Sequence, residues 1–235
     1  SGSANTAGTI NSTVSVNTTA GFSIVRFTGT GANATVGHGL GAVPKMIILK
    51  KTNGGADWIV YHNSMGNTKA LKLNTTAALS TDTGYFNSAT PTSTLFSLGN
   101  DGFSNGSSAT IIAYCFADVQ GYSKMGSYIG NNNANGAFIY TGFKPAFVII
   151  KRSSAGENWS LYDNKRLGYN PQSLMLRPNT SDVEGSYATS DSIDFVSNGF
   201  KIRTSGTALN DGTYIYMAFA EAPLVGTNNV PCTAR

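Results

Sequence analysis

Tryptophan, tyrosine and asparagine recur together in this sequence, in a combination that suits sugar binding. Residues 57–63 read Asp-Trp-Ile-Val-Tyr-His-Asn, and residues 158–164 read Asn-Trp-Ser-Leu-Tyr-Asp-Asn. Aromatic faces pack against the C–H side of a sugar ring, while amides and carboxylates hydrogen-bond its hydroxyl groups. The candidate ligand contacts are therefore Trp58, Tyr61, His62, Asn63, Trp159, Tyr162, Asp163, Asn164 and Arg166.

The two tryptophans have a second interpretation, as packing residues of a core. In an extended strand, Trp58 shares one face with Val60, and Trp159 shares one face with Leu161. A tryptophan beside an aliphatic residue on one strand face is typical of a buried position. Under this interpretation only the polar ends of the two motifs contribute to a binding rim. Both interpretations stay open at this point.

The sequence contains no recognisable catalytic constellation. A Gly-x-Ser-x-Gly nucleophile motif is absent, as is a phosphate-binding loop ending in Gly-Lys-Ser/Thr. A glycosidase needs two carboxyl groups, one of them held protonated. The chain has only three glutamates (Glu157, Glu184 and Glu221), and no spacing in the sequence pairs them. We therefore expect no enzymatic activity and assign no catalytic residue.

Metal ligands are also sparse. His38 and His62 are the only histidines, and no third ligand follows either of them at a recognisable spacing. Asp101, Asp191, Asp194 and Asp211 lie in turn-rich segments, where most aspartates serve as caps. We expect no cofactor, with calcium in such oxygen-rich loops left open. Cys115 lies in an apolar run and is expected to be buried, and a disulfide with Cys232 is an open alternative.

The sequence motifs sit within an internal repeat that spans most of the chain. Blocks from the first half return in the same order about a hundred residues later. The matched pairs are residues 21–23 with 121–123, 43–51 with 144–152, 57–63 with 158–164, 73–75 with 178–180, 100–103 with 197–200, and 111–118 with 214–221. Two copies are too few for a solenoid, so the pattern indicates duplication of one folding unit.

The elements that position these residues are predicted to be strands. Apolar runs such as 46–49, 111–116, 147–150 and 214–219 are short, rich in β-branched and aromatic residues, and bounded by Gly, Asn, Ser and Thr. We predict an all-β chain of two tandem, internally duplicated antiparallel β-sandwich units, jelly-roll-like and packed side by side. A short helical turn near residues 171–176 stays open. The predicted segments are an N-terminal arm or linker (1–20), two repeats (21–119 and 120–224) and a C-terminal tail (225–235).

Composition limits the class of partner. Only 12% of the residues are charged, against about 25% in a typical soluble domain, and the net charge of +4 is spread along the chain. No basic run indicates nucleic-acid binding, and no apolar segment is long enough to span a membrane. A surface of neutral hydroxyl and amide groups is usual in extracellular β proteins and in virion fibres.

Four blocks carry a resemblance to a known family. Residues 121–128, 140–151, 158–166 and 214–221 resemble a recurrent domain of large virion proteins, of tail or fibre type, in marine tailed bacteriophages. The resemblance covers almost the whole chain from about Gly21. It implies a location in the virion, with assembly in the host cytoplasm. It brings no established catalytic residue.

These observations together predict a host-attachment module that binds a surface glycan or another receptor through a shallow aromatic site. The partners expected are this glycan or receptor and other virion proteins, with no nucleic acid, and a homotrimer is left open. Two alternatives remain. One is a structural decoration or assembly module without a ligand, and the other is a polysaccharide depolymerase.

Overall fold

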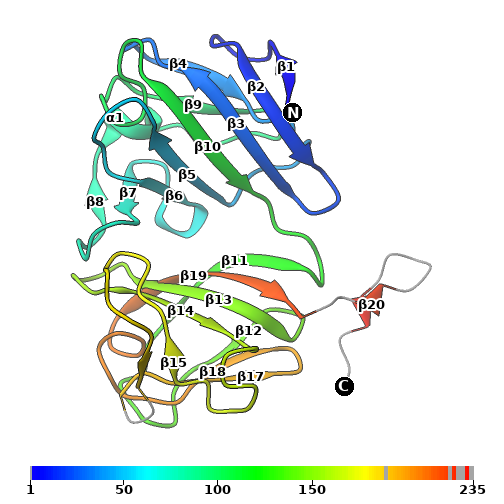
Figure 1. Cartoon of the computed structure of the whole chain (residues 1–235), viewed down its shortest axis with the longest axis vertical. Coiled ribbons are helices and arrows are strands. Elements are labelled where there is room, and N and C mark those ends of the chain that lie inside the picture. Colours follow the sequence, from blue (N-terminus) through cyan, green and yellow to red (C-terminus); the bar gives the residue numbers. More distant parts are fainter. Residues whose placement is uncertain (1, 188–189, 222–223, 226–230, 233–235) are drawn as a thin grey trace. The chain divides into compact units, whose positions relative to one another are not determined.

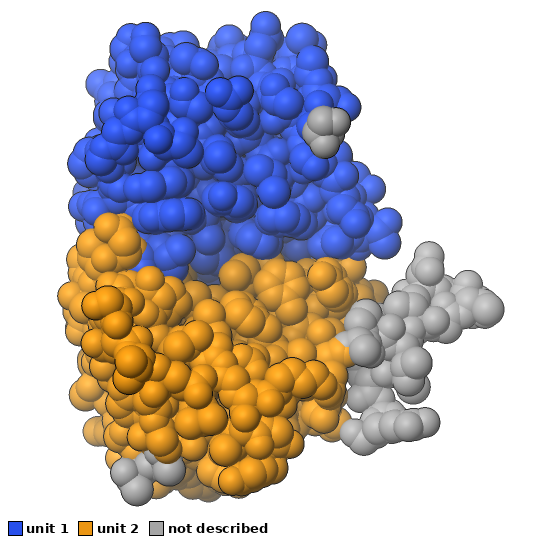
Figure 2. All heavy atoms as spheres, in the orientation of Figure 1, with its two compact units in different colours: residues 1–73, 79–118 blue, residues 74–78, 119–235 orange. Residues whose placement is uncertain are grey.

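The chain is all-β and antiparallel, as predicted. Its structure is a computed structural model that describes residues 2–187, 190–221, 224–225 and 231–232 (Figure 1). The chain forms two compact units, coloured separately in Figure 2. Unit 1 comprises residues 1–73 and 79–118, and unit 2 comprises residues 74–78 and 119–235. The boundary lies one residue before the predicted one, and residues 74–78, predicted in the first repeat, belong to unit 2.

Unit 1 is built on an eight-stranded sheet in the order β1-β2-β3-β10-β5-β6-β7-β8, with a separate pair β4-β9. The elements are β1 (Ser3–Asn5), β2 (Ser12–Asn17), β3 (Phe22–Thr28), β4 (Ala34–Gly37), β5 (Met46–Lys51), β6 (Ile59–His62), the 3-10 helix η1 (Asn63–Met65), β7 (Lys69–Lys72), β8 (Ser80–Thr81), α1 (Thr83–Phe86), β9 (Leu95–Leu98) and β10 (Thr110–Phe116).

The N-terminal segment differs from the arm or linker that the sequence predicts. β2 pairs with β3, and β1 pairs with β2, so this segment extends the sheet of its own unit. Ile10 and Val14 are buried in the core, which explains why the segment docks on its own unit. In the sequence, this segment shows only a weak apolar alternation, at Ile10, Val14 and Val16.

Unit 2 contains a four-stranded sheet in the order β11-β19-β13-β14, a three-stranded sheet β12-β18-β17 and the pairs β15-β16 and β20-β21. The strands are β11 (Ser123–Ile129), β12 (Phe138–Tyr140), β13 (Pro145–Arg152), β14 (Trp159–Asp163), β15 (Leu174–Met175), β16 (Gly185–Ser186), β17 (Ile193–Val196), β18 (Gly199–Ile202), β19 (Thr213–Ala220), β20 (Leu224–Val225) and β21 (Pro231–Cys232). The alternative of a helical turn near residues 171–176 is wrong, since Leu174 and Met175 form β15.

Each unit buries its core between its larger and its smaller sheet, as a sandwich does. In unit 1 the core joins Ile47 and Ile111 of the large sheet to Phe96 of the small one. In unit 2 it joins Ile150 of the four-stranded sheet to Ile139 of the three-stranded one. Inward residues alternate with outward ones along these strands, as in β10 and β12.

The central strand orders β3-β10-β5-β6 and β11-β19-β13-β14 follow the matched sequence blocks, which supports the predicted duplication. The cores differ where Val25 lies opposite Ala113 in unit 1 and Gly126 lies opposite Tyr216 in unit 2. A Cβ atom at position 126 would lie 2.6 Å from the Tyr216 hydroxyl oxygen, so this position requires glycine.

A buried asparagine fixes the same loop connection in both units. In unit 1 the Asn105 side chain accepts from the Thr30 N–H and donates to the Ala32 and Gly99 carbonyls. In unit 2 the Asn210 side chain accepts from the Asn131 N–H and donates to the Asn133 and Thr204 carbonyls, among others. By this equivalence, Gly99 of unit 1 corresponds to Thr204 of unit 2. Residues 100–103 therefore correspond to residues that follow Thr204, and not to residues 197–200, with which their sequence matches.

Candidate functional site

The first tryptophan motif lies mostly inside unit 1. Tyr61 and His62 are buried, and the His62 ring accepts a hydrogen bond from the Ser64 N–H at the start of η1. Trp58 is half-buried, its ring 6.3 Å from that of Tyr114 and 5.4 Å from the Lys50 ammonium. Of the four candidates in this motif, only Asn63 is exposed. The packing interpretation concerns Trp58, which is only half-buried, whereas His62, expected at a binding rim, is buried.

The second motif is packed in a similar way. Trp159 and Tyr162 are buried, and the Tyr162 hydroxyl donates to the Asp191 carbonyl at 3.1 Å. Burial raises the pKa of Tyr162 well above its ordinary value. These two side chains, like Tyr61 and His62, are therefore too deep to touch a polysaccharide.

The polar end of the second motif is tied together by an ion pair. The Asp163 carboxylate caps the turn through the Lys165 and Arg166 N–H groups. It also pairs with Arg166 Nε at 2.7 Å, and Arg166 pairs in turn with Glu184 at 3.1 Å. Asp163 and Arg166 therefore hold the loop, and Asn164 is the candidate that this arrangement leaves for a ligand.

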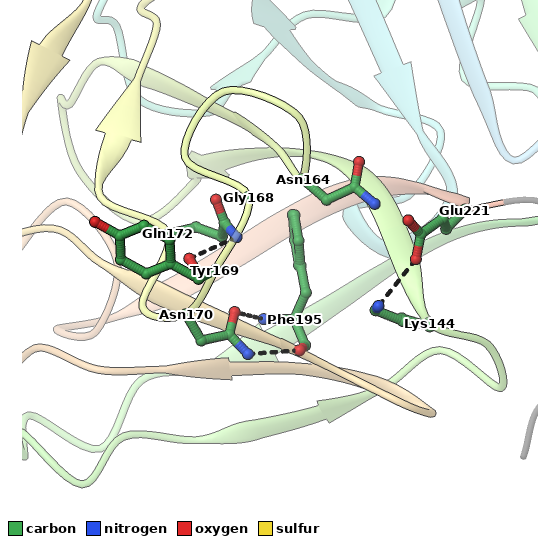
Figure 3. Close-up of a pocket in the computed structure, with 8 residues that line it drawn as sticks. All are labelled: Lys144, Asn164, Gly168, Tyr169, Asn170, Gln172, Phe195 and Glu221. Carbon is green, nitrogen blue, oxygen red and sulfur yellow. Dashed lines mark hydrogen bonds and ion pairs between the residues drawn. The ribbon is translucent and has the colours of Figure 1, made fainter. Parts of the chain in front are cut away.

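Asn164 lines a surface pocket of about 110 Å³ on unit 2 (Figure 3). In Figure 3 the Tyr169 ring lies at one side, the ion pair of Lys144 and Glu221 lies at the other, and the Phe195 ring lies between them. The full lining is Lys144, Asn164, Gly168, Tyr169, Asn170, Gln172, Phe195 and Glu221. The pocket thus gathers the Tyr169 ring, amides and one ion pair around the Phe195 ring.

The loop that carries Tyr169 is fixed by side-chain hydrogen bonds. Asn170 donates to the Phe195 carbonyl at 2.8 Å and accepts from the Phe195 N–H at 2.9 Å. The buried Gln172 amide donates to the Tyr169 carbonyl at 2.9 Å. Gly168, with φ of +79°, provides the turn before it. Tyr169 is therefore held on a rigid loop, yet 66% of its surface is exposed.

Two polar groups of the pocket are available to a ligand. Within the described residues, neither the Asn164 amide nor the Tyr169 hydroxyl makes a hydrogen bond. The two charged lining residues pair with each other, Lys144 Nζ lying 2.9 Å from Glu221 Oε2. The hydrogen bond from Lys144 lowers the pKa of Glu221, with a further contribution from Lys165. Glu221 is thus ionised, and the lining carries little net charge.

The remaining candidates have structural roles. His38 is buried, its ring within hydrogen-bond distance of the Thr92 carbonyl and the Leu40 N–H, and burial lowers its pKa. Asp101 caps a turn through the Phe103 N–H, and Asp194 and Asp211 pair with arginines. Asp191 is buried, and this burial raises its pKa. No group of three or more potential metal ligands occurs among the residues that the structure describes.

Cys115 is buried, as expected, its thiol is free, and burial raises the pKa of this thiol to about 12. The side chain of Cys232 lies outside the described residues. No helix in the described part of the chain is long and apolar enough to cross a membrane.

Sequence reasoning found Asn164 but missed Tyr169, Asn170 and Gln172. Their local signal is the run Gly168-Tyr169-Asn170-Pro171, in which an aromatic residue sits between turn-forming residues. Lys144 and Glu221 come from distant positions and meet only because β13 pairs with β19. No spacing in the sequence predicts that contact.

Comparison with known proteins places the chain in one family. The sequence model of this family, described as "Domain of unknown function (DUF7483)", matches residues 1–223. The chain belongs to this family. No curated protein matches the sequence, and no solved structure matches it.

Proposed function

We propose that this chain is a carbohydrate-binding attachment module that holds a neutral polysaccharide at the Tyr169 pocket of unit 2. The observation that carries the proposal is the exposed Tyr169 ring on a rigid loop, in one pocket with the Asn164 amide, which makes no hydrogen bond within the described residues. The resemblance to phage tail and fibre proteins and the low charge of the chain support a place in a virion, where such binding attaches the particle to a host surface.

The chemistry of the pocket favours an uncharged sugar. The Tyr169 ring offers an apolar face to the C–H side of a pyranose. The Asn164 amide offers two donors and one acceptor to its hydroxyls. Since Lys144 and Glu221 pair with each other, the lining gives no strong preference to a charged ligand. A fixed loop also reduces the entropy lost on binding.

The same lining favours binding over hydrolysis. Glu221 is the one carboxylate among the lining residues, whereas a glycosidase needs two. Its pKa is lowered by Lys144, which is opposite to what a general acid requires. We therefore do not propose depolymerase activity for this pocket.

The proposal is tested with fluorescently labelled protein on immobilised neutral polysaccharides, including dextran and β-glucans, and on marine bacterial cells. We expect Tyr169→Ala to weaken the affinity roughly tenfold, because a central exposed aromatic contact contributes about 1–2 kcal/mol. Asn164→Ala should have a smaller effect in the same direction, because one hydrogen bond is lost.

Tyr140→Ala is the matched control, since Tyr140 is 60% exposed on the same unit but lies outside this pocket. It should bind neutral polysaccharides as the wild type does. Absence of binding by the wild type to every polysaccharide and cell would contradict the function. Equal affinity of the wild type and Tyr169→Ala would contradict the assignment of binding to the Tyr169 pocket.

A further inference from the structure

A second aromatic surface on unit 2 lies outside the Tyr169 pocket. In β12, Ile139 points into the core, while Phe138 and Tyr140 face outward and are 49% and 60% exposed. Two residues apart on one strand, their Cα atoms are about 6.6 Å apart. The register continues the surface across β18, with Lys201 opposite Phe138 and Gly199 opposite Tyr140. We call these four residues, with Lys124, the β12 face.

The lysines of this face have no carboxylate partner within the described residues. Lys124 Nζ lies 5.4 Å from the centre of the Tyr140 ring and donates to the Tyr140 carbonyl at 3.2 Å. Lys201 Nζ donates to the Gly136 carbonyl at 3.0 Å. The nearest carboxylate in the register, Asp194 opposite Lys201, pairs with Arg203. The β12 face therefore carries a net positive charge beside two exposed rings.

The backbone edge of β12 is less available than its side-chain face. The Ala137 carbonyl and the Thr141 N–H form hydrogen bonds on the β18 side of the strand. The backbone N–H and C=O groups of Phe138 and Tyr140 therefore point to the open edge. Lys124 occupies the carbonyl of Tyr140 on that edge. A lysine at an edge strand opposes the addition of another strand. A ligand is thus expected on the rings rather than along the backbone.

We infer that the β12 face binds an acidic polysaccharide, separately from the proposed neutral site at Tyr169. Neighbouring sugar rings of one chain lie against Phe138 and Tyr140, while their carboxylate or sulfate groups meet Lys124 and Lys201. Lys124 and Lys201 are the only cations of the β12 face as defined above. Single-stranded nucleic acid needs a groove of positive charge along several nucleotides, so this face favours a polysaccharide.

The test compares dextran with carboxymethyl-dextran, two probes that share a backbone and differ in charge. We expect the full chain to bind carboxymethyl-dextran through the β12 face, more weakly at high salt because salt screens the partly exposed charges of Lys124 and Lys201. Phe138→Ala/Tyr140→Ala and Lys124→Gln/Lys201→Gln should each weaken this binding roughly tenfold. Thermal melting of each variant verifies that the surface changes leave the fold intact.

Lys51→Gln/Lys69→Gln removes the same charge from unit 1 and should leave the affinity unchanged. Tyr169→Ala should weaken the binding of dextran and should leave unchanged the further gain in affinity that the carboxymethyl groups bring, which separates this inference from the proposed function. An equal loss in the unit 1 lysine variant would overturn the inference, since it would indicate non-specific charge attraction. Tighter binding of oligo(dT) than of carboxymethyl-dextran would overturn it as well. So would a homodimer that only Phe138→Ala/Tyr140→Ala dissociates.

Discussion

The two units share a central strand order, but a strand edge that is covered in unit 1 is open at the corresponding place in unit 2. In unit 1, Val36 of β4 pairs with Phe96, and in unit 2, Ile139 of β12 pairs with Phe200. The edge of β4 is covered by the N-terminal segment, whose Thr9 and Ile10 N–H groups both donate to the Thr35 carbonyl. Without such a segment, β12 stays an edge strand within the described residues. The difference shows how one sandwich closes a surface that the other leaves open.

The side chains follow that difference. Opposite the N-terminal segment, Gly37 leaves room for Asn5, whose side-chain oxygen would lie 2.5 Å from an added Cβ atom. The corresponding position in unit 2 is Tyr140, which is 60% exposed. Small residues thus accompany the covered edge, and aromatic residues accompany the open one. The units share their framework, and the proposed ligand surfaces lie on unit 2.

The buried asparagines test whether the shared framework is equally important in both units. Asn105→Ala and Asn210→Ala should each lower the free energy of unfolding by about 3 kcal/mol, because several buried backbone groups lose their partners. Urea denaturation followed by tryptophan fluorescence measures this change. A large effect at Asn210 with none at Asn105 would break the correspondence. The exposed Asn63→Ala is the control and should change stability little.

Two lysines at corresponding positions of β5 and β13 predict a different dependence of stability on pH in the two units. Lys50 Nζ donates to the Ala56 carbonyl beside Trp58, whereas Lys151 is fully buried and donates to the Arg152 and Thr76 carbonyls. Burial lowers the pKa of Lys151 from 10.5 to about 8. Between these two values the unfolded state binds more protons than the folded state. Stability should therefore rise with pH from about 8 toward 10.5.

Urea denaturation at several pH values measures that rise in the wild type and in Lys151→Met, which should lack it. Lys50→Met retains Lys151 and should keep the rise. Buried tyrosines such as Tyr128 and Tyr162, whose pKa values are raised, oppose it at the alkaline end. The difference between wild type and variant is therefore the informative quantity. An identical slope in Lys151→Met would refute the assignment to this lysine.

Local patterns in the sequence predicted the strands, because alternation and β-branched runs report directly on burial. Residues 46–49 are buried at all four positions, as their apolar run indicates. The candidate site was predicted less well. Trp159 and Tyr162 have the composition of a sugar site, but they are core residues. Whether an aromatic residue is exposed depends on what packs over it. Tyr169 is exposed because hydrogen bonds to the Phe195 backbone fix the position of its loop.

The smallest expected effect concerns one position that carries a charge in unit 1 and an amide in unit 2. Asp57 pairs with Lys72 at 2.8 Å, whereas the corresponding Asn158 accepts from the Asn179 amide at 2.7 Å. Asp57→Asn should cost about 0.5 kcal/mol at low salt and less at high salt, because a partly exposed ion pair is screened.

Asn158→Ala instead removes a neutral hydrogen bond, so its cost of about 1 kcal/mol should not depend on salt. Urea denaturation of both variants at two salt concentrations separates these cases. A salt-independent loss in Asp57→Asn would mean that the aspartate acts through hydrogen bonding, as the asparagine does. The two units would then hold this strand by the same interaction despite their difference in charge.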